Sequence, residues 1–322
     1  MSTPFSSLRR RLALVGGRPA SPSSEGVQGR RDDAEYRPAT LLEPPLRHVA
    51  VGSPEPWRED VAFLDGTQHA ELIGYVGTLP ILGAVIRAAV RLRHDRKLGL
   101  AVARCRRLVI ARREALAAFG DSPAGYETVG VEDAGDPHPI RDLQSARGLV
   151  DRARAGLEIE VARAFRAADE RVEGEPGSPS LRSGRQTWLI IDGSLAASPD
   201  WSTDPRMIGV VKSHAMLPFM GDELETYLTL PKGHRSSLFM PESRRVTPLY
   251  SWALRLHDFA GRDLFYGLVR IEAPATAVTR DSADMISRHV LAERAPLSND
   301  PRADRLLYGV HDVERYLGAQ GA

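Results

Sequence analysis

The chain is poor in cysteine and in long apolar runs. Among its 322 residues Cys105 is the one cysteine, which excludes an internal disulfide and a zinc site built from cysteines. No apolar stretch approaches the ~18 residues that a membrane span needs, and the arginine-containing opening MSTPFSSLRRRLALVGG lacks the apolar core of a signal peptide. These absences predict a soluble, cytoplasmic chain without a targeting segment.

Several sequence motifs are absent as well. There is no GxxxxGK(S/T), GxGxxG, HExxH or GxSxG pattern and no zinc-ligand spacing, which argues against an ATPase, a dinucleotide enzyme, a zincin and a serine hydrolase. The net charge is only +1, so any nucleic-acid surface must be a local patch. Apolar residues, by contrast, are plentiful, and they suffice for the core of one large domain or two modest ones.

Two apolar runs end on the same dipeptide, Asp-Gly. VAFLDGTQ places Asp65 at the end of the first run, and WLIIDGSL places Asp192 at the end of the second. An apolar run closed by a glycine turn predicts a buried strand, and open α/β sheets build their sites at the C-terminal ends of strands. Because Asp-Gly is also a common turn dipeptide, a purely structural turn is the alternative at either position.

As neighbours, these two strands would bring two carboxylates together. Like charges at such short range repel unless a cation lies between them. Hard metal ions bound by oxygen ligands are what hydrolytic phosphoryl chemistry uses. The repeated Asp-Gly pattern therefore predicts a metal site at Asp65 and Asp192.

The densest positive charge follows the first of these runs. Over residues 86–93, apolar residues alternate with Arg87, Arg91 and Arg93, which predicts a strand with one apolar and one basic face. A second basic tract follows at Arg104, Arg106, Arg107, Arg112 and Arg113. Arginines on an exposed sheet face are commonly just solvated, whereas beside a metal site they would hold a phosphate backbone.

Over residues 142–171, apolar residues recur at spacings of three and four, which predicts the longest helix of the chain. Glu158 and Glu160 lie on this helix and point about 200° apart, so at most one of them faces the site. Two segments rich in Gly, Pro and Ser predict irregular structure: a flexible insertion over residues 173–186 and an extended arm over 18–58. The arm would either wrap a partner subunit or follow the surface of its own chain.

The rest of the chain predicts further strands and helices. MIGVVKSH predicts a strand that ends at Lys212 and His214, and GDELETYLTL predicts a short helix. PLYSWALRLHD and LFYGLVRIEAP predict a hairpin. Residues 283–294 and 303–317 predict two closing helices.

The order of these blocks resembles the NurA family of nucleases: VAFLDGT, then GLE in the long helix, then LIIDGSL, IGVVKSH, YSWALRL and VRIEAP. The resemblance implies an RNase H-like α/β core with a mixed central sheet flanked by helices over residues 59–322, preceded by an extended arm over 1–58. It also implies a homodimer that acts on DNA ends with Mn²⁺ or Mg²⁺. The implied partner is a HerA-type hexameric ATPase, in DNA end resection or anti-phage defence. In such a dimer, Arg87, Arg91 and Arg93 would line a shared DNA channel.

The same resemblance implies the site residues. Asp65 and Asp192 match the two family aspartates, and Glu158 matches the helix glutamate, with Glu160 in reserve; Asp65, Glu158 and Asp192 would hold the metal. Lys212 matches a lysine that would stabilise charge or orient water, unless it merely snorkels at a strand end. His214 is a candidate proton carrier. The tyrosine that many members carry near the C-terminus is missing here, so Asp304, Asp300 and His311 compete as a further ligand.

Two other functions remain open from the sequence. An actin-like or sugar-kinase-like phosphotransferase also places acidic, glycine-rich turns after strands of an RNase H-like core, although its phosphate loops favour Asp-x-Gly and no adenosine motif is present here. A non-catalytic adaptor that docks an ATPase hexamer is the second alternative, against which the presence of all three acidic positions argues.

Overall fold

The computed structural model describes residues 5–19, 35–36, 38–132, 135–172, 187–214, 216–242, 248–298 and 303–320. Its helices in these ranges are α1 (Ser6–Leu14), α2 (Arg113–Phe119), α3 (Pro139–Val172), α4 (Pro199–Thr203), α5 (Gly221–Leu228), α6 (Arg280–Glu293) and α7 (Tyr308–Ala319), with short 3-10 helices η1 (Leu195–Ala197) and η2 (Ala303–Arg305). In this described part of the chain, no helix combines the length and the apolar character that crossing a membrane requires.

The strands are β1 (Arg18–Pro19), β2 (Glu35–Tyr36), β3 (Ala39–Leu41), β4 (His48–Ala50), β5 (Val61–Val76), β6 (Leu79–His94), β7 (Lys97–Arg112), β8 (Glu127–Val131), β9 (Trp188–Asp192), β10 (Met207–Val211), β11 (Met216–Leu217), β12 (His234–Ser236), β13 (Phe239–Pro241), β14 (Leu249–Arg255) and β15 (Leu268–Pro274). Apart from the pair β2 and β11, they form one 13-stranded sheet with the main order β3-β13-β14-β15-β10-β9-β5-β6-β7-β8.

The middle of this sheet has the mixed strand directions that the sequence predicts for the core. β5, β6 and β7 form an antiparallel meander, β9 lies parallel to β5 on its other side, and β10 lies parallel to β9. The chain passes through α3 between the meander and β9. This mixed sheet flanked by helices confirms the predicted α/β class.

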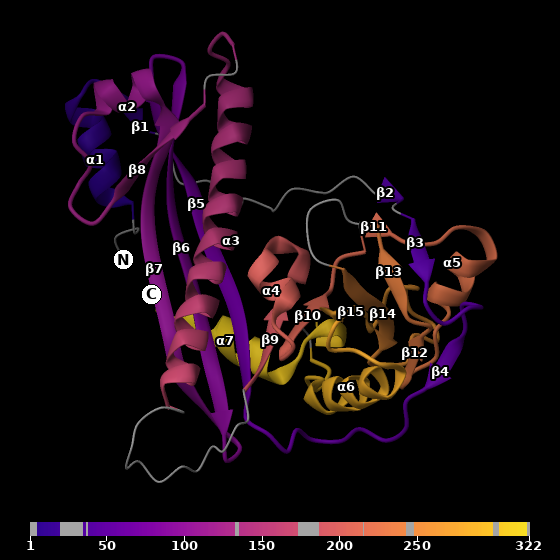
Figure 1. Cartoon of the computed structure of the whole chain (residues 1–322). Coiled ribbons are helices and arrows are strands. Elements are labelled where there is room, and N and C mark those ends of the chain that lie inside the picture. Colours follow the sequence, from indigo (N-terminus) through magenta and orange to yellow (C-terminus); the bar gives the residue numbers. More distant parts are fainter. Residues whose placement is uncertain are drawn as a thin grey trace.

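Two helices cover opposite faces of the long strands. Successive side chains of β5 point to opposite faces, so Ala62 and Leu64 pack in the cluster with α3, while Val61 and Phe63 pack in the cluster with α7. A Cβ at Gly309 of α7 would overlap with the ring of Phe63, so this glycine lets the helix approach the strand closely. Figure 1 shows α3 lying along the long strands, which confirms the predicted long helix.

The other half of the sheet contains the predicted hairpin, in which β14 and β15 pair antiparallel. The indole N–H of Trp252 in β14 donates to Ser287 Oγ of α6 at 2.9 Å, which fixes α6 on this part of the sheet. The predicted short helix is α5, and the two predicted closing helices are α6 and α7. The predicted insertion over residues 173–186 lies outside the described residues.

The described part of the predicted arm is mostly extended, and it follows the surface of its own chain. β3 pairs with β13 and β4 pairs with β12, and Figure 1 shows the segment between β4 and β5 running past α6. Glu43, which lies between β3 and β4 in the chain, is buried and accepts a hydrogen bond from Arg235 Nη1 at 2.7 Å. Further N-terminal, α1 buries Leu8 and Leu12 beside Phe119. The boundary at residues 58 and 59 stays a prediction.

The predicted basic strand is β6, but its basic face is covered. Arg91 Nε lies 2.6 Å from Asp312 Oδ2 of α7, and Arg93 Nη1 donates to Glu293 Oε2 of α6 at 2.9 Å. Arg87 donates to a backbone carbonyl near the end of α7 in an exposed position. The interpretation as a DNA channel is therefore wrong for Arg91 and Arg93, because α6 and α7 cover that face and supply carboxylates.

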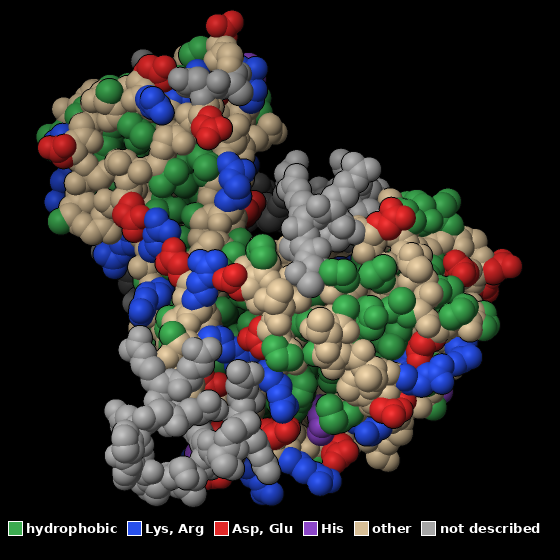
Figure 2. Space-filling view, in the orientation of Figure 1, with side chains coloured by type: hydrophobic (Ala, Val, Ile, Leu, Met, Phe, Trp, Pro, Cys, Tyr) green, Lys and Arg blue, Asp and Glu red, His purple; other side chains and the backbone are tan. Residues whose placement is uncertain are grey.

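Two arginines of the second basic tract, Arg106 and Arg112, are paired with acidic residues, whereas Arg104, Arg107 and Arg113 are exposed. Arg106 Nη2 lies 2.5 Å from Glu127 Oε2, and Arg112 Nη1 lies 3.3 Å from Asp142 Oδ1. On the face shown in Figure 2, Lys and Arg side chains are interspersed with Asp and Glu side chains over α3 and the strands beside it. This mixture agrees with the near-neutral net charge.

Candidate active site

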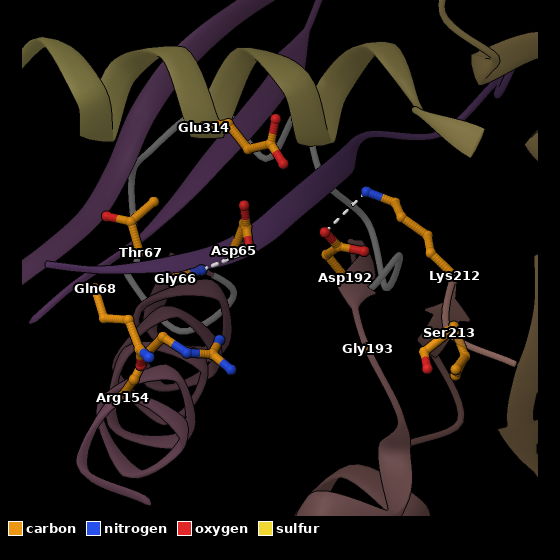
Figure 3. Close-up of a pocket in the computed structure, with 11 residues that line it drawn as sticks. Asp65, Gly66, Thr67, Gln68, Arg154, Asp192, Gly193, Lys212, Ser213 and Glu314 are labelled. Carbon is orange, nitrogen blue, oxygen red and sulfur yellow. Dashed lines mark hydrogen bonds and ion pairs between the residues drawn. The ribbon is translucent and has the colours of Figure 1, made fainter. Parts of the chain in front are cut away.

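A cleft of about 570 Å³ opens where β9 and β10 end, between α3 and α7. Figure 3 shows side chains converging on it from five elements: β5, the end of β9, the segment after β10, and the helices α3 and α7. The lining residues are Asp65, Gly66, Thr67, Gln68, Arg154, Asp192, Gly193, Val211, Lys212, Ser213 and Glu314.

The two aspartates are neighbours, as the sequence predicts. β5 and β9 run parallel and pair as far as Leu64 and Ile191, so the next residues, Asp65 and Asp192, emerge beyond the last pair. β9 ends at Asp192, whereas β5 continues to Val76. The prediction that each aspartate ends a strand therefore holds for Asp192 and is wrong for Asp65.

The glycines after the two aspartates explain this difference. Gly193 has a φ of +146°, which favours glycine, and it leads the chain out of β9. Gly66 stays within β5, where a Cβ would overlap with the Glu158 carboxylate of α3. Gly66 therefore makes room for the helix glutamate instead of forming a turn. Its N–H donates to Asp65 Oδ1 at 2.7 Å.

The turn after Asp192 is held from β15 by Glu272, a residue that the sequence analysis did not single out. Its buried carboxylate accepts hydrogen bonds from Ser194 Oγ at 2.7 Å and from the Leu195 N–H at 2.9 Å. Arg270 Nη2 donates to the other carboxylate oxygen at 2.8 Å. Because Glu272 is fixed on both sides, it fixes the turn that follows Asp192. In the sequence, the signal that could have identified Glu272 is its position in the VRIEAP block.

The acidic side chains of the site disfavour one another's charged forms. Burial raises the pKa of Asp65 well above its usual value, and the negative charge of Asp192 raises it further, while Lys212 acts in the opposite direction. Burial also raises the pKa of Glu158, against the effect of Arg154. Lys212 Nζ lies 2.8 Å from Asp192 Oδ2. A cation among these carboxylates would stabilise their charged forms.

Glu314 of α7 completes an acidic group that the sequence did not predict. One carboxylate oxygen from each of Asp65, Asp192 and Glu314 lies within 4.8 Å of the other two. Carboxylate oxygens are the ligands that Mg²⁺ and Mn²⁺ prefer, and the mutual repulsion around Asp65 favours a bound cation, so these residues fit a divalent metal ion. Glu158 lies beside Gly66 and is not a member of this group.

The structure also separates the other candidates from the site. Glu160 is exposed, and its carboxylate lies 3.9 Å from Arg106. Glu158 is buried beside Gly66, so it is the helix glutamate that lies next to the site. His214 lies beyond the end of β10, where its Nε2 is 2.9 Å from the Leu268 carbonyl oxygen. Burial lowers the pKa of His214 to about 4. Its ring is therefore a neutral, structural group, and the proton-carrier assignment is not supported.

Neither of the two C-terminal candidates that the structure describes, Asp304 and His311, belongs to the acidic group. Asp304 is buried and accepts a hydrogen bond from the Gly267 N–H at 2.6 Å, which gives it a structural role. His311 Nδ1 lies 3.5 Å from Glu314 Oε2, one helical turn before it. Asp300 lies outside the described residues. The C-terminal carboxylate at the site is instead that of Glu314.

Comparison with known proteins gives two similar solved structures. No protein-family model and no curated protein matches the chain. The NurA nuclease from Sulfolobus solfataricus is 9% identical, with a TM-score of 0.47 over 85% of this chain and 86% of that one. The catalytic domain of human endonuclease V is 13% identical, with a TM-score of 0.34 over 81% of this chain and 82% of that one. A NurA nuclease is thus among the structures to which this chain is similar, as the order of the sequence motifs predicts.

Proposed function

We propose that this chain is a metal-dependent nuclease that hydrolyses phosphodiester bonds in DNA. The observation that carries the proposal is the convergence of Asp65, Asp192 and Glu314, beside Lys212, in an open cleft. Such a set of carboxylates suits a hard divalent cation, and an adjacent amine suits an anionic substrate. The order of the sequence motifs, which resembles the NurA family, supports the same reaction.

Each residue of the site has a role in this proposal. Asp65, Asp192 and Glu314 would hold Mn²⁺ or Mg²⁺, and Glu158 adds a fourth negative charge. When bound, such an ion lowers the pKa of a water molecule and neutralises charge on the phosphate. Lys212 would stabilise the charge of the transition state. Asp192 and Arg305, which donates to the Lys212 carbonyl at 3.1 Å, hold this lysine at the cleft.

The proposal extends to the setting that the family resemblance implies. DNA ends would be the substrate, and the chain would work as a cytoplasmic homodimer with a HerA-type hexameric ATPase, in end resection or anti-phage defence. On the face shown in Figure 2, charges of both signs are mixed, and the proposal places the DNA contacts that serve cleavage at the cleft.

The test is cleavage of linear DNA by the purified protein with Mn²⁺, with and without a chelator. The wild type should cleave only when Mn²⁺ is available, Asp192→Asn should not cleave, and Glu160→Gln should cleave like the wild type. Absence of cleavage together with calorimetric binding of a nucleotide would instead indicate a phosphotransferase. Absence of both would indicate a non-catalytic adaptor.

A further inference from the structure

The cleft contains a second cationic side chain besides Lys212. Arg154 lies on α3 and lines the cleft, with its side chain 32% exposed. In Figure 3 its guanidinium points into the cleft from the side of α3, whereas Lys212 enters from the side of β10. Arg154 Nη1 donates to Glu158 Oε1, four residues later on the same helix. The two cations thus stand on opposite sides of the carboxylates.

The pair of Arg154 and Glu158 differs from an ordinary helix-surface pair. Exposed pairs at this spacing contribute only a few tenths of a kcal/mol and exchange readily with solvent. Arg163 of α3 and Asp200 of α4, with side chains 62% and 53% exposed, form an exposed ion pair elsewhere on the same helix. The side chain of Glu158 is only 9% exposed and is confined by Gly66. A carboxylate buried in this way requires a positive partner.

The three-carboxylate group does not supply that partner. A cation between Asp65, Asp192 and Glu314 would be shared by three oxygens within 4.8 Å of one another, and Glu158 is not among them. A second ion at Glu158 would have to displace the Arg154 guanidinium. Arginine does not lose its proton in proteins, so this positive charge remains in place at every working pH.

We propose that Arg154 takes the place of a second divalent cation in this site. The inference rests on the proposed nuclease function. One ion is held by Asp65, Asp192 and Glu314, while Arg154 neutralises Glu158. Since a guanidinium has five N–H donors and the contact with Glu158 uses one nitrogen, Arg154 also donates to an oxygen of the phosphate. Arg154 is thereby a substrate-contacting residue, and this assignment revises the prediction that Glu158 is a metal ligand.

The experiment is a titration of the protein with Mn²⁺ alone, without DNA. Binding is measured by calorimetry and by the EPR signal of the unbound ion. The wild type should bind one Mn²⁺ per chain. Arg154→Ala and Arg154→Gln should each bind a second ion, because Glu158 is released, and adding Glu158→Gln to either variant should return the number to one. Arg163→Ala, on the same helix but outside the cleft, is the matched control and should bind one ion.

The possible results separate this inference from the proposed function. Two ions in the wild type, or one ion in both Arg154 variants when they remain folded by thermal melting, would overturn the role of Arg154 and leave the nuclease proposal standing. No bound ion in the wild type would overturn both. A second readout is DNA binding measured at several salt concentrations with Ca²⁺ in place of Mn²⁺. Arg154→Gln should reduce the slope of the logarithm of the binding constant against the logarithm of the salt concentration by the amount expected for about one phosphate contact. An unchanged slope would contradict the contact between Arg154 and phosphate.

Discussion

One carboxylate oxygen of Asp65 lies within 4.8 Å of one carboxylate oxygen of Asp192, although the first residue is in the middle of a strand and the second ends one. The pairing of β5 and β9 stops one residue before both of them. Between this point and Gly74, where β1 pairs with β5, no described strand pairs with this edge of β5, and the cleft lies beside the first residues of this stretch. Side chains from α3 and α7 can therefore reach the same aspartate from different sides.

Asp65→Asn should abolish cleavage while raising stability at neutral pH. Burial and the charge of Asp192 raise the pKa of Asp65 in the folded state. The charged carboxylate therefore destabilises the fold at any pH above about 3.8, the usual pKa of an aspartate in the unfolded chain. Asparagine removes this charge and keeps the acceptor for the Gly66 N–H. Thermal melting at several pH values should show a higher Tm than the wild type at pH 7, by roughly 2–4 °C for each kcal/mol gained. The difference should shrink toward pH 4. A lower Tm at pH 7 would contradict the electrostatic argument.

Glu158→Gln should reduce cleavage by roughly tenfold, because it removes the charged acceptor that holds Arg154 at the cleft. Glu160→Gln should have no effect, because Glu160 is exposed beside Arg106 on the other side of the helix. Rates of DNA cleavage at saturating Mn²⁺ compare the two variants. If the two results were exchanged, the register of α3 at the site would be wrong.

Gly66→Ala should cost about 1–3 kcal/mol of unfolding free energy and should also reduce activity. The added methyl group would overlap with the Glu158 carboxylate, so either α3 or the glutamate must move. Gly99→Ala is the matched control on β7, since a Cβ at that position meets nothing within 4 Å. Urea denaturation of both variants measures the difference. Equal stabilities would mean that Glu158 adapts without cost.

Arg93→Ala should destabilise the fold by about 3 kcal/mol, because it leaves the buried Glu293 carboxylate without its partner. Arg87→Ala, which removes only an exposed hydrogen bond of 3.4 Å to a backbone carbonyl, should change the stability little. Both should leave the salt dependence of DNA binding as in the wild type. A slope that flattens in the folded Arg93 variant would restore the idea that the basic face of β6 contacts DNA.

The arm should contribute stability that depends on pH. Burial alone would raise the pKa of Glu43, but hydrogen bonds from Arg235, Arg280 and the Leu238 N–H lower it to about 2. Because the pKa of Glu43 is lower in the folded state, its charged form stabilises the fold fully at pH values above about 4.5, the usual pKa of a glutamate in the unfolded chain. This stabilisation is lost as the pH falls from 4.5 toward 2. Glu43→Gln should therefore be less stable than the wild type at pH 7, and the difference in urea stability should narrow below pH 4.5. A constant difference would mean that the pair adds no charge-dependent stability.

The strand core and the two aspartates were predictable because they depend on local patterns. The apolar runs before Asp65 and Asp192, and the three- and four-residue spacing in α3, each determine an element without knowledge of the rest of the chain. The role of Gly66 was not predictable in this way, because the same dipeptide serves for a turn at Asp192 and for the approach of a helix at Asp65.

The contribution of α7 was not predictable, because it depends on how that helix docks. Glu314 reaches the site since α7 packs closely on Phe63 through Gly309, and no local pattern specifies that contact. The same docking pairs Asp312 with Arg91 and hides the face that period-2 alternation predicts to be basic. The alternation is real, but only the tertiary structure shows what covers each face.

The pairing of the N-terminal segment with β12 and β13 also sets an order of events during synthesis. Glu43 and its partner Arg235 are 192 residues apart in the chain. At the usual elongation rate of about 5–20 residues per second, the short strands beside Glu43 wait roughly 10–40 s before the ribosome has made the strands that they join. The residues of the meander are all made within that interval, so the meander can fold while β3 and β4 are still unpaired. This edge of the sheet therefore closes only after the meander is complete, although β3 and β4 precede the meander in the chain.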